Sequence, residues 1–221
     1  MIEVKSFTFN DYQENTYLVI KDGKCIIIDP GNYYDNENTQ IKNFIEENFL
    51  TPLFILITHV HIDHVLGIKY LSDEYLIDTY IPKSELDFHD NMINYASMFG
   101  FEKYGHQNNV KLIDDSSKLT FLEIPIEILS LPGHSPGHLG FYFREDKLCF
   151  SGDVLFKNSI GRTDLPGGSY DVLIKSIKNK LFLLGDDDIV FPGHGPKTTI
   201  YEEKKNNPFL NWKIIFQICL H

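Results

Sequence analysis

The chain has few cysteines, few basic residues and no long apolar run, and each shortage argues against a class of protein. Its three cysteines, Cys25, Cys149 and Cys219, lie far apart, which argues against a disulfide framework or a CxxC site. Cys25 and Cys149 fall in apolar runs, so we expect both to be buried. Only 20 lysines and arginines stand against 31 acidic residues, and the resulting net charge of −11 argues against a nucleic-acid partner.

Targeting signals are also missing from the sequence. Residues 1–6 show no basic region followed by an apolar region, so no signal peptide is predicted. No apolar stretch reaches the length of a transmembrane helix. We therefore expect a cytoplasmic protein without membrane contact, and the sequence identifies no protein partner.

The first half of the chain predicts strands followed by helices. With 221 residues, 43% of them hydrophobic, the chain is long enough for one domain with a substantial core. Asp22-Gly23 predicts the turn of a hairpin, and Phe49 is expected on the buried face of the first helix. The predicted elements are strands at 2–9, 17–20 and 24–28, a helix at 37–49, a strand at 53–57 and a helix at 64–71.

The second half repeats this order of strands and then helices. Its short runs are rich in β-branched and aromatic residues, which favour strands. Two sheets packed face to face, with the helices outside, would bury all the apolar runs. The predicted elements are strands at 119–124, 126–131, 139–143 and 147–150, a helix at 170–184, a strand at 189–191 and a helix at 201–205.

The stretch THVHIDH at residues 58–64 is the strongest functional signal in the sequence. It places three histidines and one aspartate within six residues, directly after the apolar run at 53–57. That run predicts a buried strand, so the chain leaves the sheet at Thr58 and presents these side chains on a loop. Imidazole and carboxylate groups suit zinc, iron or manganese. The stretch therefore predicts a metal site at a strand end.

Three later motifs each place one such side chain beside glycine, again just after a predicted strand. They are LPGHSPGH at 131–138, FSGD at 150–153 and FPGHG at 191–195, which contribute His134, Asp153 and His194. Glycine allows the backbone angles that tight turns at strand ends require. Together with the first stretch, the three motifs form a specific pattern.

With these motifs the sequence resembles the metallo-β-lactamase fold superfamily, in its glyoxalase II-like branch, from about residue 7 to residue 210. The resemblance implies an α+β fold, a four-layer αβ/βα sandwich with the metal site at the edge of two packed mixed sheets. It also implies two divalent metal ions. By position, the first ion's ligands are His59, His61 and His134, the second ion's are Asp63, His64 and His194, and Asp153 is the bridging carboxylate.

The ligand set narrows the branch of the family. Position 64 is His, whereas the true β-lactamases of this fold carry a different residue there and are typically exported. Position 61 is His rather than the Glu of the flavodiiron branch. The nuclease branch usually has an inserted domain, for which this chain has no spare segment. Hydrolysis of a small ester or thioester is therefore the favoured reaction.

The stretch GDVLFKNSIGRTDLPGG at 152–168 resembles the short glyoxalase II-like hydrolases of bacteria. Arg162 matches the place where longer glyoxalases carry a basic residue near the thiol portion of glutathione, which predicts a substrate contact. The alternative is a structural arginine paired with Asp164. Longer glyoxalases also have a C-terminal helical domain that contacts glutathione. The apolar tail at 212–216 is too short for it, so we expect one domain over residues 1–221.

The resemblance implies hydrolysis of a thioester of the S-lactoylglutathione (hydroxyacylglutathione) type. A hydroxide bridging the two metals would attack the carbonyl carbon, and Asp63 would orient it. Zinc is the expected metal, and iron or manganese would accept the same ligands. One alternative is a persulfide dioxygenase with a single iron held by His59, His134 and Asp153. A second alternative is a lactone or ester hydrolase of the same fold. A third is a non-catalytic protein, which would lack some of the metal ligands.

Several other residues near these motifs have two readings. His138 is expected to support a ligand from outside the metal's coordination shell, as is Asp29. The segment from Pro82 to Tyr104 predicts mostly helix, either as plain packing or as a lid near the metal site. His89 and His106 lie in or just after it without partners at ligand spacing, which predicts ordinary core or solvated histidines.

Overall fold

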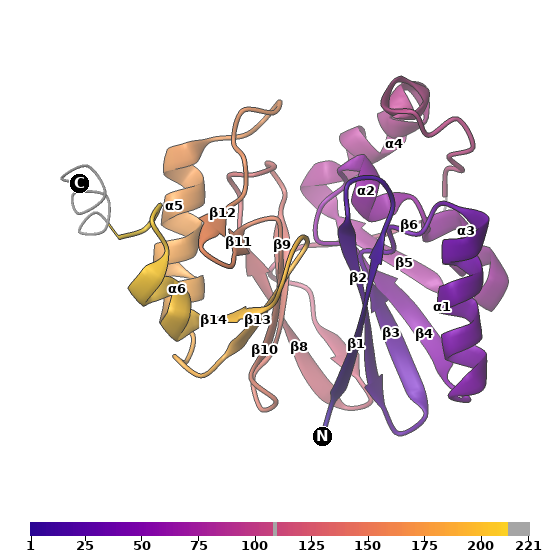
Figure 1. Ribbon diagram of the computed structural model, residues 1–221, viewed down its shortest axis with the longest axis horizontal. Helices are drawn as coiled ribbons and strands as arrows, with labels where there is room; N and C mark the ends of the chain where they lie inside the picture. The colour runs from indigo at the N-terminus through magenta and orange to yellow at the C-terminus, as the bar shows by residue number, and fades with distance from the viewer. Residues whose placement is uncertain (108–109, 212–221) are drawn as a thin grey trace.

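Two mixed sheets lie face to face in the computed structural model, which describes residues 1–107 and 110–211 (Figure 1). The first sheet consists of β1 (Glu3–Phe9), β2 (Glu14–Lys21), β3 (Lys24–Ile28), β4 (Thr51–Leu56), β5 (Asp78–Pro82) and β6 (Val110–Ile113). These strands lie in sequence order, antiparallel from β1 to β3 and parallel from β3 to β6.

The second sheet has the strand order β14-β13-β10-β9-β8-β7. Its strands are β7 (Leu119–Phe121), β8 (Ile124–Ser130), β9 (Leu139–Phe143), β10 (Leu148–Gly152), β13 (Ile189–Pro192) and β14 (Thr198–Thr199). β10 and β13 are parallel, whereas the other neighbours are antiparallel. A separate small hairpin joins β11 (Leu155–Phe156) to β12 (Ser159–Ile160).

Helices cover the outer face of each sheet (Figure 1). They are α1 (Asp35–Glu47), α2 (Ile62–Val65), α3 (Ile68–Tyr75), α4 (Leu86–Tyr95), α5 (Tyr170–Asn179) and α6 (Ile200–Asn206), with 3-10 turns η1 (Lys83–Glu85), η2 (Ala96–Phe99) and η3 (Leu181–Leu183). α1 and α3 lie against the first sheet, and α5 and α6 against the second. Among the described residues, no helix has both the length and the apolar character to cross a membrane.

Three apolar cores separate these four layers. In β3, Ile27 packs toward the helices of the first sheet, whereas Ile26 packs toward the second sheet. In β10, Phe150 faces the first sheet and Cys149 faces the opposite helical layer. Successive side chains of a strand point to opposite faces, so one core forms between the sheets and one under each helical layer. The predicted four-layer αβ/βα sandwich is confirmed.

The Asp22-Gly23 hairpin is confirmed, because both residues have positive φ (49° and 71°) and Lys21 pairs with Lys24 across the turn.

The buried position expected for Phe49 is wrong. The helix ends at Glu47, and Phe49 follows it with a φ of 52° and 90% exposure. Because the helix ends before Phe49, this side chain points into solvent. Local periodicity predicts such helix ends poorly.

Other predicted elements differ from the structure mainly at their ends. The helix expected at 64–71 is two helices, α2 and α3, and its inward residues Val65, Ile68 and Leu71 are buried as predicted. The strand expected at 119–124 stops at Phe121, since Leu122 and Glu123 form a tight turn with positive φ. The helix expected at 170–184 ends at Asn179 and continues as the 3-10 turn η3.

Only one face of the segment from Pro82 to Tyr104 packs against the rest of the protein. Met92, Ala96 and Phe101 join the core under the first helical layer, whereas Ile93 and Met98 are exposed. Cys25 and Cys149 are buried, as expected. Cys219 and the tail at 212–216 lie outside the described residues.

Candidate metal centre

The ligand-type side chains converge at one edge of the two sheets. Those of residues 59–64 follow β4, and Asp29 follows β3, its parallel neighbour. On the second sheet His134 follows β8, Asp153 follows β10 and His194 follows β13. β10 and β13 are parallel, and β8 runs in the same direction because β9 lies antiparallel between β8 and β10. The carboxyl ends of these strands therefore place all seven predicted ligands in one region.

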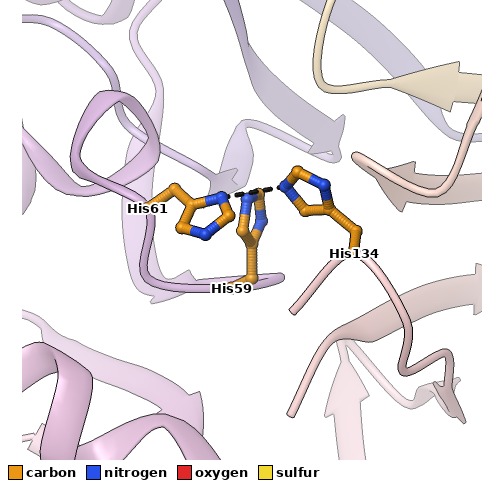
Figure 2. Close-up of side chains that lie close together, drawn as sticks. All are labelled: His59, His61 and His134. Carbon is orange, nitrogen blue, oxygen red and sulfur yellow. Dashed lines mark hydrogen bonds between the residues drawn. The ribbon is translucent and has the colours of Figure 1, made fainter. Parts of the chain in front are cut away.

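Three of these side chains form what we call the triple-histidine group, His59, His61 and His134. Each offers a nitrogen, and these nitrogens lie within 4.8 Å of one another. Figure 2 shows the rings of His61 and His134 turned toward each other, with 2.8 Å between His61 Nδ1 and His134 Nε2. His134 Nδ1 donates to the Arg162 carbonyl at 2.8 Å, so Nε2 is the ring nitrogen that faces His61.

The other three form the mixed group, Asp63, His64 and His194, whose ligand atoms also lie within 4.8 Å of one another. Asp63 Oδ2 is 3.1 Å from His194 Nε2 and 3.6 Å from His64 Nε2. Asp63 and His64 both belong to the single turn of α2. The short helix thus turns both side chains toward the loop after β13.

Asp153 lies between the two groups. Its Oδ1 is 3.5 Å from His64 Nε2, and its Oδ2 is 3.5 Å from both His134 Nε2 and His194 Nε2. A side chain at Gly193 would collide with Asp153 Oδ1, so the glycine makes room for the carboxylate. One carboxylate therefore faces both groups, the position predicted for the bridging ligand.

The electrostatics differ between the two groups. Burial lowers the pKa of His59 and lowers that of His61 to about 4, so both imidazoles are neutral. Burial also opposes charge on His194, but its hydrogen bonds with Asp153 and Asp63 outweigh this and raise the pKa of His194 to about 9. The carboxylates of Asp63 and Asp153 thus attract positive charge, whereas His59 and His61 offer neutral lone pairs.

Divalent cations fit this donor set. Three buried polar atoms at the centre, His59 Nε2, His64 Nε2 and Asp153 Oδ1, have no hydrogen-bond partner among the described residues. Buried polar atoms without partners are costly. Neutral imidazoles and carboxylates are the usual donors to zinc, iron and manganese. The residues present are therefore compatible with one ion in each group.

Asp29 and His138 support the centre from outside the two groups, as expected. Asp29 accepts from the Thr58 amide at 2.7 Å and the Thr58 hydroxyl at 2.6 Å, and its Oδ2 lies 3.1 Å from His64 Nδ1. Those contacts occupy both carboxylate oxygens and orient His64. His138 Nε2 accepts from the Asp153 amide at 3.1 Å, and this bond fixes the loop after β10.

Two further residues hold the ligand loops, and the sequence analysis missed both. Glu85, which is 1% exposed, accepts from the Val60 amide at 3.0 Å and the Gly137 amide at 2.8 Å. Asn15 donates to the carbonyls of Pro192 at 3.1 Å and Gly195 at 2.7 Å. Both side chains bond to backbone groups that lie far away in the sequence. No local sequence motif indicates such contacts.

Arg162 is paired with Asp164 in the structure. Its Nε and a terminal nitrogen donate to the two carboxylate oxygens, each at 2.7 Å, and its side chain is 61% exposed. This pairing corresponds to the alternative reading of Arg162. A substrate contact stays a prediction.

His89 is buried, in agreement with the reading of a core histidine, but the fold brings His106 and Asp90 beside it, which the sequence spacing did not indicate. The ring centroids of His89 and His106 lie 4.3 Å apart, and Asp90 lies beside both. The fold brings the loop before β6 against α4, so residues 17 positions apart in the sequence meet.

Residues 9–194 match the model of the metallo-beta-lactamase superfamily. The chain belongs to the metallo-beta-lactamase superfamily. This member is a metallo-hydrolase, similar to the probable metallo-hydrolase YqgX of Bacillus subtilis (strain 168), with 38% identity over 200 residues, 90% of this chain and 93% of that protein. It is also similar to the hydroxyacylglutathione hydrolase GloC of Haemophilus influenzae, with 60% identity over 87 residues, 39% of this chain and 41% of GloC.

Two solved structures of the superfamily are similar over nearly the whole chain. The crystal structure of BLEG-1 B3 metallo-beta-lactamase has a TM-score of 0.87 and 35% identity, covering 95% of this chain and all of that one. The crystal structure of TTHA1623 in a di-iron-bound form has a TM-score of 0.82 and 35% identity, covering 93% of this chain and all of that one. The expected fold family is therefore confirmed.

Proposed function

We propose that the protein hydrolyses a small thioester of the hydroxyacylglutathione type with the help of two divalent metal ions. The observation that carries this proposal is the position of Asp153 between the triple-histidine group and the mixed group. The similarity to GloC over 87 residues supports the thioester as substrate. The place of action that we propose is the cytoplasm, and the partner is a small molecule.

In this proposal His59, His61 and His134 would hold one ion, Asp63, His64 and His194 would hold the other, and Asp153, which lies between the two groups, would be shared. Bound divalent ions supply an acidified water as nucleophile and stabilise negative charge on the carbonyl oxygen. Zinc is the proposed metal, and the di-iron form of TTHA1623 makes iron the first alternative.

The chain's own residues position the reaction. Asp63, only 8% exposed, aims a carboxylate oxygen at the centre beside His194 and is the proposed orienting group for the attacking water. Asp29 holds His64 through Nδ1, and the Arg162 carbonyl holds His134 through Nδ1. Fixing the second ring nitrogen in this way leaves Nε2 of each imidazole to face the centre.

The similarity to BLEG-1 over the full chain makes β-lactam hydrolysis the second candidate. An amide of a strained ring and a thioester are both opened by attack of water on a carbonyl carbon. The two candidates share the same centre and differ in the group that leaves.

The test is a substrate panel on protein stripped of metal and reloaded separately with zinc, iron(II) or manganese. It contains S-lactoylglutathione, a neutral thioester, a lactone and a cephalosporin, together with oxygen uptake on a glutathione persulfide. We expect the thioesters to be hydrolysed fastest, with activity lost on stripping and restored on reloading.

Preferred turnover of the cephalosporin would replace the first candidate by the second. Lactone opening or persulfide-dependent oxygen uptake without thioester turnover in any metal form would overturn the proposal. Elemental analysis of each form gives the number of ions bound per chain.

A further inference from the structure

A second cluster of ligand-type side chains lies between α4 and the loop before β6, with no residue in common with the centre described above. It consists of His89, Asp90 and His106, each offering one ligand atom within 4.8 Å of the others. Asp90 Oδ1 lies 3.2 Å from His89 Nδ1 and 3.9 Å from His106 Nε2. Two imidazole nitrogens thus converge on the same carboxylate oxygen.

The spacing of these atoms suits a small divalent ion. With metal–ligand bonds of ~2.0–2.2 Å, neighbouring ligand atoms of a tetrahedral site lie roughly 3.3–3.6 Å apart. The distance from Asp90 Oδ1 to His89 Nδ1 is close to that value, and the distance to His106 Nε2 exceeds it by only a few tenths of an ångström. Both distances from Asp90 thus match the ligand spacing of a tetrahedral site to within about half an ångström.

The surroundings of the rings favour a cation over a simple histidine stack. His89 is 1% exposed, and burial lowers its pKa, so the ring is a neutral donor. His89 Nε2 and His106 Nδ1 are buried and have no hydrogen-bond partner among the described residues. On each ring the nitrogen that lies near Asp90 is the other one, so Asp90 is the polar group that both rings share. Asp90 is exposed and supplies the negative charge that a divalent ion requires.

We propose that His89, Asp90 and His106 form a separate site for a divalent transition-metal ion such as zinc, with water completing the coordination. An ion there would tie the loop at residues 104–107 to α4. The segment that it anchors begins at η1, where Glu85 holds the ligand loops of the catalytic centre. Because its ligands come from α4 and from the loop before β6, the bound ion would hold these two segments together.

The experiment counts ions and uses no activity assay. Metal-free protein is titrated with Co²⁺ and Zn²⁺ in competition with a coloured chelator, and bound metal is measured by elemental analysis. We expect wild-type protein to bind one equivalent more than His106→Ala or Asp90→Asn. The affinity for that equivalent should fall more than about tenfold in both variants, since even residues outside the coordination shell typically contribute this much. Zn²⁺ should also raise the Tm of wild-type protein more than that of either variant.

Two matched variants control for general effects. Asp87→Asn removes an exposed carboxylate from the same helix, and Gln107→Ala alters the same loop. Both should bind as many ions as wild-type protein. Equal ion counts in wild-type protein and His106→Ala would overturn the proposal, as would an equal loss in Asp87→Asn. His89 is left unchanged because its removal from the core could prevent folding.

Discussion

The two sheets contribute to the metal centre in different ways. The first sheet supplies His59, His61, Asp63 and His64 from a single loop and the helix turn that follows it. The second sheet supplies His134, Asp153 and His194 from three separate loops. Local chain geometry sets the spacing on the first sheet, whereas tertiary packing sets it on the second.

The loops of the second sheet depend on residues of the first half of the chain. Glu85 bonds to the backbone beside the ligands at both Val60 and Gly137, and it thereby joins the two loops of the triple-histidine group. Asn15 bonds to the backbone on both sides of His194. Substitutions at these two residues should therefore disturb ligand placement without removing any ligand.

The largest effect is expected from Asp63→Asn, which alters the locally encoded loop itself. Asparagine keeps the shape of the side chain but loses the charge that would hold a cation and orient the attacking water. We expect turnover of S-lactoylglutathione to fall about 10²- to 10⁴-fold, the range typical of a positioned acid–base group. The same preparation is assayed for turnover, for metal content by elemental analysis and for folding by circular dichroism.

The fold of Asp63→Asn should be intact, because no core residue changes. Near-normal activity with a full complement of metal would mean that Asp63 has no such role.

Glu85→Gln tests whether the two loops of the triple-histidine group need a common anchor. Glutamine can accept one of the two amide bonds, but its NH₂ group faces the other donor. We expect a loss of about 1.5–3 kcal/mol in the free energy of unfolding, since bonds to a buried charged acceptor are worth this much. Metal affinity of the triple-histidine group should fall about tenfold or more. Urea unfolding and chelator competition measure the two effects.

The matched control is Glu127→Gln, which removes a carboxylate that pairs with Arg144 at an exposed site. It should leave metal affinity unchanged. If Glu85→Gln and Glu127→Gln behaved alike, Glu85 would have no positioning role.

Asn15→Ala should disturb only the mixed group, because Asn15 bonds to the loop that carries His194. It removes two hydrogen bonds that hold the loop carrying His194, a loss of about 1–3 kcal/mol in the free energy of unfolding. We expect weaker binding of one ion, several-fold in Kd, with the ion of the triple-histidine group unaffected. Asn48→Ala, which removes an exposed amide bonded to Phe44 at the end of α1, is the control. Equal weakening of both ions would show that Asn15 acts on the whole fold.

The same contrast explains how far the sequence could predict the structure. The ligand loops follow apolar strands and carry glycine or closely spaced histidines, so their positions were predicted from local patterns. Glu85 and Asn15 were missed because their partners are backbone amides and carbonyls 25 to 180 residues away. A single sequence has no signal for such contacts. The proximity of His89 and His106 has no sequence signal for the same reason, since only the folded loop brings them together.

Helix ends were the other source of error. Phe49 fits the apolar period of α1, yet the chain adopts a positive φ there and leaves the helix. The hydrophobic period alone does not specify where a helix stops, because the end depends on backbone capping and on the next strand. The alternation in β3 and β10, in contrast, follows from strand geometry and was predictable.

The smallest effect is expected at Arg162, on the loop between β12 and α5. Its side chain already pairs with Asp164, so a substrate carboxylate must compete for the guanidinium. We expect Arg162→Ala to raise KM for S-lactoylglutathione only about two- to fivefold, the scale of exposed ion pairs. KM for a neutral thioester should change less, and kcat should be retained for both. The companion variant Asp164→Asn frees the guanidinium and should lower KM for the anionic substrate. Equal changes for the anionic and neutral substrates in both variants would leave Arg162 with a structural role only, as partner of Asp164.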